Sequence, residues 1–477
     1  MKEQTRFYSS LGRLLVLNAL VKPLWIFGID RQVQNITGTA VYGSYFSLFN
    51  LSFVLSFLLD WGLGSFINRE IAASPGLQEA RTGMLFRIKL FLVVLYALVV
   101  FSVARLSGIT QMHWVLLLIA IQALTSLFLF TRSIINAHQW FGTDAFFSVL
   151  DKLLMIFLCG GFILFPALGG LSIDRFLWIQ VTCTALALLI ALMLLNRKGI
   201  ALWTTPNKEK LIPLLQAALP YAGIVLLMSA HYRLDGFLLE RLHPQGDLEA
   251  GRYAGAYRLL DAANVAAFLL TSFLLSYVAR HQQQLHKANE AVLFIRNFLL
   301  VLSAGITVVA LLFAPWIQSL LYHDRSPESI RVLAVCLPVL TGYSLVQVYG
   351  TVLTAMGHIR TFCMIVFLAL LLNTVLNLFW IPSLGAIGSC YAALISHTAC
   401  GIVCMLVARQ KTGLSLAPRS LLSAILIGGI LYSFLYFGLS IIPNIPVLIS
   451  CGVILVIALA FITRLFDLNK WKSVFTN

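Results

Sequence analysis

The chain has 477 residues, of which 60% are hydrophobic and only 11% are charged, and its mean hydropathy is +0.91. A soluble domain cannot hide this much apolar surface, so the composition excludes a soluble globular protein and predicts a polytopic membrane protein. The formal net charge of +15 fits the excess of Lys and Arg in cytoplasmic loops of membrane proteins, and we expect no nucleic-acid partner.

Apolar runs of about 17 to 25 residues, the length of an α-helix that crosses a bilayer, recur along the whole chain. Membrane barrels would instead show short segments of alternating polarity. We therefore predict an all-α polytopic membrane protein with about 14 transmembrane helices. Their centres lie roughly at residues 20, 53, 95, 122, 156, 184, 228, 266, 304, 342, 369, 395, 429 and 454.

The distribution of Lys and Arg predicts the orientation of these helices. Most of these residues fall on one side of the membrane when both termini are assigned to the cytoplasm, and cytoplasmic loops carry the excess of positive charge. On this assignment Lys89, Arg132 and Arg296 belong to the cytoplasmic side.

The longest polar break, from Asn196 to Lys210, is basic and follows the sixth predicted helix. It divides the first twelve helices into two groups of six, and the last two helices stand apart. We predict an N-terminal lobe at residues 1–196, a basic cytoplasmic linker at 197–210, a C-terminal lobe at 211–410, and accessory helices with a cytoplasmic tail at 411–477.

Two short motifs recur in the second group of helices. Gly43–Tyr45 has a counterpart in Gly255–Tyr257, about 212 residues later, and Pro166–Gly169 has one in Pro382–Gly385 at nearly the same offset. Because each group contains an even number of helices, the repeat is predicted to be parallel. Repeated halves with a site between them are typical of alternating-access transporters.

Charged side chains inside predicted helices are the main candidates for a substrate site, since charge in a membrane interior is costly and usually functional. Lys22, Arg233 and Arg258 lie in the outer halves of their helices, with Tyr257 beside Arg258. They either line a polar cavity or extend to the outer membrane interface. Lys152, with its neighbour Asp151, is expected to reach back to the cytoplasmic face.

Three intramembrane carboxylates are candidates for ion coupling or for the cavity wall: Asp60, Asp235 and Asp261. Asp60 either binds Na⁺ or a proton, or neutralises Lys22. Asp261 lies three residues after Arg258, at a spacing that allows a pair within one helix.

Asn373 and Asn377 are four residues apart and therefore share a helix face. They either contact a glycan or form hydrogen bonds between helices. The sequence contains no nucleophile with its base, no metal-binding spacing and no phosphate-cradling loop. We therefore predict a transport protein without an enzymatic activity, a metal or another cofactor, driven by a gradient of Na⁺ or H⁺ or by its substrate.

Several motifs resemble those of the Wzx-type polysaccharide or O-antigen flippases, a family of the multidrug/oligosaccharidyl-lipid/polysaccharide (MOP) exporter superfamily. The motifs are Val41–Tyr45, Asp60–Gly64, Asn68–Ala72, Asp235 with Tyr253–Tyr257, and the late series Asn373, Asn377, Ile381, Pro382, Gly385 and Gly388.

This resemblance implies two six-helix lobes around a central cavity that opens alternately to the cytoplasm and the periplasm. The implied substrate is an undecaprenyl-diphosphate-linked oligosaccharide moved across a bacterial inner membrane for O-antigen, capsule or exopolysaccharide assembly. A polysaccharide polymerase and a chain-length regulator are the implied partners. A cation-coupled drug or metabolite antiporter of the same superfamily is the alternative, but it would need a mainly acidic cavity.

Overall fold

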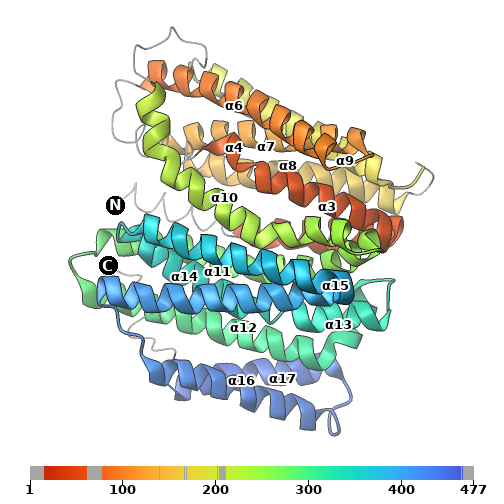
Figure 1. The fold of residues 1–477 in the computed structure, drawn as a ribbon, viewed down its shortest axis with the longest axis vertical. Helices are drawn as coiled ribbons and strands as arrows, with labels where there is room; N and C mark the ends of the chain where they lie inside the picture. The colour runs from red at the N-terminus through yellow and green to blue at the C-terminus, as the bar shows by residue number, and fades with distance from the viewer. Residues whose placement is uncertain are drawn as a thin grey trace. The chain divides into compact units, whose positions relative to one another are not determined.

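The computed structural model describes residues 16–61, 78–138, 140–165, 167, 169–200, 202, 211–463 and 465, and within these ranges the regular structure is entirely helical (Figure 1). The prediction of an all-α polytopic membrane protein is confirmed. The chain divides into two compact units, Met1–Phe237 and Leu238–Asn477.

The helices of the N-terminal unit begin with a helical stretch at residues 16–23. The following elements are η1, a π-helix, at Leu24–Asp30, α2 at Arg31–Thr37, α3 at Thr39–Leu55, α4 at Phe57–Asp60, α6 at Gln78–Leu106, α7 at Met112–Ala137, α8 at Phe141–Leu164, α9 at Ile173–Arg197 and α10 at Leu211–Leu242, whose end crosses into the second unit.

The C-terminal unit contains the remaining helices. They are α11 at Gly246–Arg280, α12 at Leu285–Leu321, α13 at Pro327–Cys336, α14 at Val339–Ala355, α15 at Ile359–Thr412, α16 at Pro418–Gly438 and α17 at Ile445–Ile462.

The division between the two compact units lies inside α10. Most of the polar segment 197–210 falls outside the described residues, so the predicted bounds of the lobes and of the linker stay a prediction. Near this division α10 contacts α3 at Gly236. A Cβ atom on Gly236 would lie 2.1 Å from Nδ2 of Asn50, so only a glycine lets the two helices approach this closely.

Twelve helices in the described part of the chain are long and apolar enough to cross a membrane. One of them, α15, has 54 residues and would extend about 80 Å as a straight helix, far more than a bilayer needs. It must therefore count as two spans. Counted in this way, the described residues hold thirteen candidate spans. The first predicted span, centred near residue 20, begins outside the described residues, and the helical stretch at residues 16–37 carries Lys22, Asp30 and Arg31.

The break in α15 lies at Gly385, whose φ of 55° and ψ of −134° are not helical. Asn377 and Asn373, before the break, contact Ser389 and Ser396 after it, at 2.7 Å and 3.2 Å respectively. The residue that lies further before the break therefore contacts the residue that lies further after it. The two halves form an antiparallel hairpin, which Figure 1 shows as α15 doubling back.

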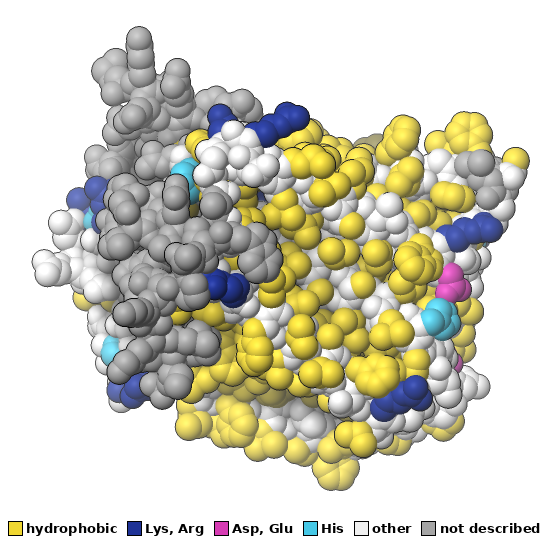
Figure 2. Space-filling model, turned by 90° about the horizontal axis from the view of Figure 1, so that it is seen from above, with side chains coloured by type: hydrophobic (Ala, Val, Ile, Leu, Met, Phe, Trp, Pro, Cys, Tyr) yellow, Lys and Arg dark blue, Asp and Glu magenta, His cyan; other side chains and the backbone are white. Residues whose placement is uncertain are grey.

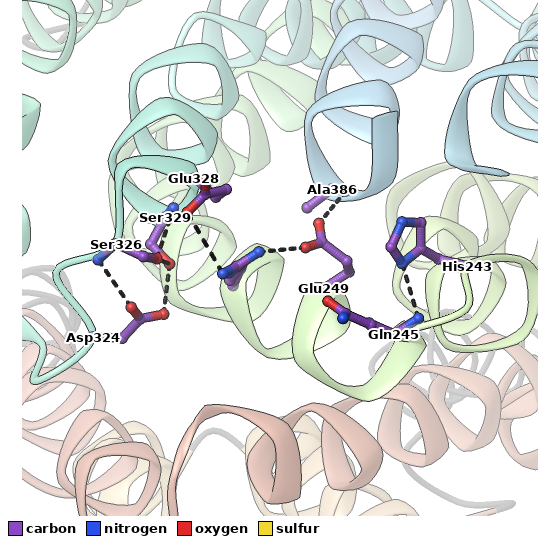
Figure 3. A network of polar contacts seen from close by, with 9 residues as sticks. His243, Gln245, Glu249, Asp324, Ser326, Glu328, Ser329 and Ala386 are labelled. Carbon is purple, nitrogen blue, oxygen red and sulfur yellow. Dashed lines mark hydrogen bonds and ion pairs between the residues drawn. The ribbon is translucent and has the colours of Figure 1, made fainter. Parts of the chain in front are cut away.

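A buried carboxylate from another helix caps the second half of this hairpin. Oε2 of Glu249, in α11, accepts a hydrogen bond of 2.8 Å from the N–H of Ala386, and its Oε1 accepts one of 2.6 Å from Nη1 of Arg252 (Figure 3). Nη2 of Arg252 lies 3.7 Å from Oε2 of Glu328 in α13. One side chain thus satisfies a helix start that would otherwise be buried without a partner.

Next to this network, Asp324 fixes the start of α13. Its Oδ2 accepts a hydrogen bond of 2.6 Å from the Ser329 hydroxyl, and its Oδ1 accepts one of 3.0 Å from the N–H of Ser326 (Figure 3). Burial alone would raise the pKa of the Asp324 carboxyl, but these hydrogen bonds and the charge of Arg252 together hold that pKa below its ordinary value.

The helices of the N-terminal unit bury one face and expose another that is equally apolar. Side chains of α6, α7, α8 and α9 form its core, among them Leu92, Phe128, Phe147 and Ala187.

The outer side of α6 carries a second apolar stripe. Phe91 and Leu98 are 64% and 61% exposed, and Val94 and Phe101 lie on the same side of the helix. Figure 2 shows a face on which hydrophobic side chains cover the centre. Exposure of this kind identifies a surface that lipid covers.

In the C-terminal unit, a buried arginine ties α16 to α12. Arg296 is 1% exposed, and its guanidinium donates to Asn297 at 2.8 Å, to the Tyr349 hydroxyl at 3.2 Å, to the carbonyl of Leu416 and to the Ser420 hydroxyl. All of these partners are neutral oxygens. The arrangement satisfies the cation without a carboxylate and anchors the start of the accessory helix α16.

We expect Gly385→Ala to destabilise the protein more than Gly357→Ala. Both glycines have positive φ, so each alanine adds backbone strain of roughly 1–2 kcal/mol. At Gly385 the new Cβ would also lie 2.4 Å from Oε2 of Glu249, whereas at Gly357 nothing lies within 4 Å. Thermal unfolding in detergent measures the difference, and equal losses for the two variants would contradict the capping role of Glu249.

We also expect acid to remove the stability that Asp324 contributes. A carboxyl whose folded pKa is lowered stabilises the fold fully above its unfolded pKa, near 4, and loses this contribution as the pH falls through the folded value. At pH 7 the Asp324→Asn variant should therefore unfold at a lower temperature than the wild type. This gap should close as the pH falls below about 4, and a gap independent of pH would show that the charge of Asp324 is not involved.

Candidate functional site

In the N-terminal unit, the predicted cation Lys22 lies within electrostatic range of Arg132, Lys152 and Asp151. Nζ of Lys152 is 3.2 Å from Oδ2 of Asp151, and Nε of Arg132 is 2.9 Å from Oδ1 of Asp144. Three cations and two carboxylates therefore gather inside this unit. Arg132, which the charge pattern placed on the cytoplasmic side, lies within the span of α7.

An irregular helical segment and its aromatic side chain adjoin this cluster. The ammonium of Lys152 lies 5.2 Å from the centre of the Trp25 ring, which stacks on Phe176 at 5.9 Å. Trp25 belongs to η1. π-helical turns are rare in proteins, and those that occur often lie at functional sites. At the end of η1, Asp30 accepts a hydrogen bond of 2.8 Å from the Tyr42 hydroxyl.

The sequence reasoning did not single out Asp30. It lies beside Arg31 at the outer end of the first apolar run, where a charged pair is typical of the end of a helix. The sequence does not indicate that this segment is π-helical.

Asp60 pairs with a lysine that the charge pattern assigned to the cytoplasmic side. Nζ of Lys89 lies 3.4 Å from Oδ1 of Asp60, and the lysine side chain is 3% exposed while that of Asp60 is 46% exposed. Lys89 lies near the start of the candidate span Gly83–Leu106, and its place on the cytoplasmic side stays a prediction. The structure brings Asp60 to Lys89, a cation that the sequence reasoning had not considered as its partner.

Arg233 and Asp235 lie in the part of α10 that packs within the N-terminal unit. The guanidinium carbon of Arg233 is 5.2 Å from the centre of the Phe53 ring and 6.0 Å from that of Phe49, distances at which an aromatic face attracts a cation. Asp235 is 1% exposed and therefore buried. Whether either side chain binds a substrate or an ion stays a prediction.

Arg258 lies inside the C-terminal unit and is 6% exposed. Its Nη1 donates a hydrogen bond of 3.0 Å to the hydroxyl of Tyr322, which in turn donates to the carbonyl of Gly255 at 2.8 Å. The hydroxyl of Tyr257 lies 3.4 Å from that of Tyr343. Arg258 and Tyr257, predicted together, thus each contact a buried tyrosine of the same unit, whereas the side chain of Asp261 is half-buried.

Asn373 and Asn377 are both fully buried in α15. Nδ2 of Asn377 donates to Oδ1 of Asn373 at 3.0 Å, and each asparagine also bonds a serine of the other half of the hairpin, as described above. Their amides therefore hold the hairpin together. A glycan contact at these residues stays a prediction.

That these charges bind an anionic ligand stays a prediction. Each unit buries cations at depths where they need compensation by protein groups or by a ligand. Within the described residues, no group of three or more His, Cys, Asp or Glu side chains could hold a metal ion.

Comparison with known proteins gives a family for the sequence. Residues 31–276 match the family described as polysaccharide biosynthesis protein. A search of curated proteins found no match.

Comparison of the fold gives three solved membrane proteins. The lipid II flippase MurJ in an inward closed conformation has a TM-score of 0.71 and 12% identity, covering 94% of this chain and 97% of its own. An inward-facing multidrug resistance MATE family transporter of the MOP superfamily has a TM-score of 0.66 and 17% identity, covering 85% and 98%. The Vibrio cholerae MATE transporter VcmN has a TM-score of 0.61 and 17% identity, covering 86% and 98%.

We expect the pair of Lys89 and Asp60 to be structural. Asp60→Asn leaves a buried ammonium without its carboxylate and should destabilise the protein by about 1–2 kcal/mol, less than for a fully buried pair because Asp60 is half-exposed. The double variant Lys89→Met with Asp60→Asn should regain most of that stability, as measured by thermal unfolding. Loss of ion-dependent transport in a stable double variant would instead assign Asp60 to coupling.

Proposed function

Because the chain belongs to the family of polysaccharide biosynthesis proteins, we propose that it is a flippase for an undecaprenyl-diphosphate-linked oligosaccharide. The substrate moves from the cytoplasmic to the periplasmic leaflet of a bacterial inner membrane and then serves O-antigen, capsule or exopolysaccharide assembly. The predicted relationship to the MOP superfamily is confirmed by the family and by the folds of the solved transporters.

One combination of observations carries this proposal. A sequence of a polysaccharide biosynthesis family adopts a fold shared with a protein named as a lipid II flippase, over 94% of its length. The solved proteins of this fold are named as transporters and a flippase, not as enzymes. Flipping of a lipid-linked saccharide is the transport function that joins the family with the fold.

The cations of the N-terminal unit support an anionic substrate. Lys22, Arg132 and Lys152 outnumber the two carboxylates beside them, so the cluster can compensate a diphosphate group that crosses the membrane. An inside-negative potential drives an uncompensated anion outward with about 2.3 kcal/mol per charge per 100 mV. We assign Arg233 and Arg258 the same task of holding the diphosphate.

Alternating access is the mechanism we propose. Solved multidrug transporters of this fold are described in inward-facing and outward-facing conformations. In this chain the carboxylates Asp235 and Asp261 are the groups that we assign to coupling with Na⁺ or H⁺. Both termini face the cytoplasm in this proposal, and a polysaccharide polymerase and a chain-length regulator act on the translocated product.

A cation-coupled drug or metabolite antiporter is the second candidate. The fold shared with multidrug resistance transporters favours it, while the family and the excess of cations in the N-terminal unit favour the flippase.

Deletion of the gene tests the proposal. We expect undecaprenyl-linked oligosaccharide to accumulate on the cytoplasmic face, and the wild-type gene to remove it. Arg258→Ala and Arg233→Ala should restore transport at least about tenfold less well, because a lost charge-assisted hydrogen bond is worth roughly 1.5–3 kcal/mol. Extraction of the lipid-linked oligosaccharide and mass spectrometry measure the accumulation.

Arg360→Ala is the matched control, because Arg360 is an exposed arginine in the first turn of α15. It should restore transport fully. Unchanged surface glycan in the deletion strain, with no accumulated intermediate, would reject the flippase and favour the antiporter. Full rescue by well-expressed Arg233→Ala and Arg258→Ala would retain the flippase but remove both arginines from its site.

A further inference from the structure

The C-terminal unit carries a pair of amide side chains at the middle of two neighbouring helices. Nε2 of Gln347, halfway along α14, donates a hydrogen bond of 2.7 Å to Oδ1 of Asn264, halfway along α11. The hydroxyl of Thr271 donates to Oε1 of Gln347 at 3.4 Å. These contacts orient the pair, so that the position of the Asn264 amide is fixed.

The pair differs from the two asparagines of α15 in being accessible. Asn264 and Gln347 are half-buried, whereas Asn373 and Asn377 are fully buried within the α15 hairpin. In the described part of the chain Nδ2 of Asn264 donates no hydrogen bond, and it is not among the buried polar atoms that lack a partner. Two N–H groups of Asn264 therefore remain open at the surface of the unit.

Open amide N–H groups disfavour contact between this surface and lipid. An amide that points into hydrocarbon loses its hydrogen bonds to water at a cost of several kcal/mol. A pair that only joined α11 to α14 would need no open N–H groups. Accessible amides within membrane-spanning helices therefore indicate contact with water and with a polar ligand.

The side chains next to Asn264 indicate which class of ligand this surface can bind. Asp261 and Phe268 lie one turn to either side of Asn264 on the same face of α11, and Phe268 is 67% exposed. The face thus offers amide donors and acceptors, a carboxylate acceptor and an apolar ring. Sugars present paired hydroxyl groups, which both donate and accept, on rings with apolar C–H faces. A phosphate would instead require cations.

We propose that Asn264 and Gln347 bind hydroxyl groups of the oligosaccharide carried by the lipid, with Phe268 packing against a sugar ring. This inference rests on the proposed flippase function and extends it to the recognition of the glycan. The amides select the substrate by its hydroxyl groups, because a site built to bond a hydroxyl disfavours a ligand that leaves its amides unpaired.

Binding to two lipids tests the inference. Purified full-length protein in detergent is titrated with the oligosaccharide lipid extracted from the deletion strain and, separately, with undecaprenyl diphosphate, which has no sugar. Asn264→Leu and Gln347→Leu should each bind the oligosaccharide lipid about tenfold more weakly than the wild type. Their affinity for undecaprenyl diphosphate should stay within about twofold of the wild type.

Two further variants control for structure. Gln282→Leu changes an exposed amide in the turn after α11 and should bind both lipids as the wild type does. Asn264→Gln keeps the amide and should retain part of the preference for the sugar, so that the inference can be tested even if a leucine variant unfolds.

The outcomes separate the inference from the function on which it rests. Leucine variants that bind the oligosaccharide lipid as tightly as the wild type would overturn the inference alone, as would equal weakening toward both lipids. A wild-type protein that shows no preference for the oligosaccharide lipid over undecaprenyl diphosphate would contradict the inference, and binding of neither lipid would contradict the flippase as well.

Discussion

The absence of water from the membrane interior is the constraint on which this structure depends. Each charge and each broken helix end in a span must find its partner within the protein or in a ligand. Glu249 shows the consequence most clearly, because its carboxylate caps the backbone where α15 reverses at Gly385. The reversal makes two spans of one 54-residue helix, and the glycine is needed because a Cβ would collide with that carboxylate.

The same constraint separates structural cations from candidate functional ones. The Arg296 guanidinium is held by neutral oxygens from four residues and anchors α16. Lys89 has Asp60. Lys22, in contrast, lies near two further cations and one carboxylate, an arrangement that stabilises an anion better than it stabilises the protein alone.

The sequence predicted the helical architecture well because membrane-spanning helices are long and uniformly apolar. It also identified the repeated Pro-x-Leu-Gly motif, whose glycines, Gly169 and Gly385, both adopt positive φ. Partnerships between helices were predicted less well. The sequence suggested Lys22 for Asp60 where the structure shows Lys89, since hydropathy gives depth along a helix but not which helices are neighbours. The pair of Asn264 with Gln347 leaves no pattern in the sequence for the same reason. The π-helical η1 leaves none because its residues are as apolar as those of an α-helix.

The central claim is that the protein moves a lipid-linked oligosaccharide across a bilayer. The most direct measurement reconstitutes the purified protein in vesicles that contain the extracted oligosaccharide lipid and follows access of an external, membrane-impermeant glycosidase to the glycan. Our account predicts that glycan on the inner leaflet becomes accessible over time only in vesicles with the wild-type protein. Glycosidase access that stays limited to glycan on the outer leaflet, as in protein-free vesicles, would contradict the account. This result would have to hold under every imposed ion gradient and membrane potential.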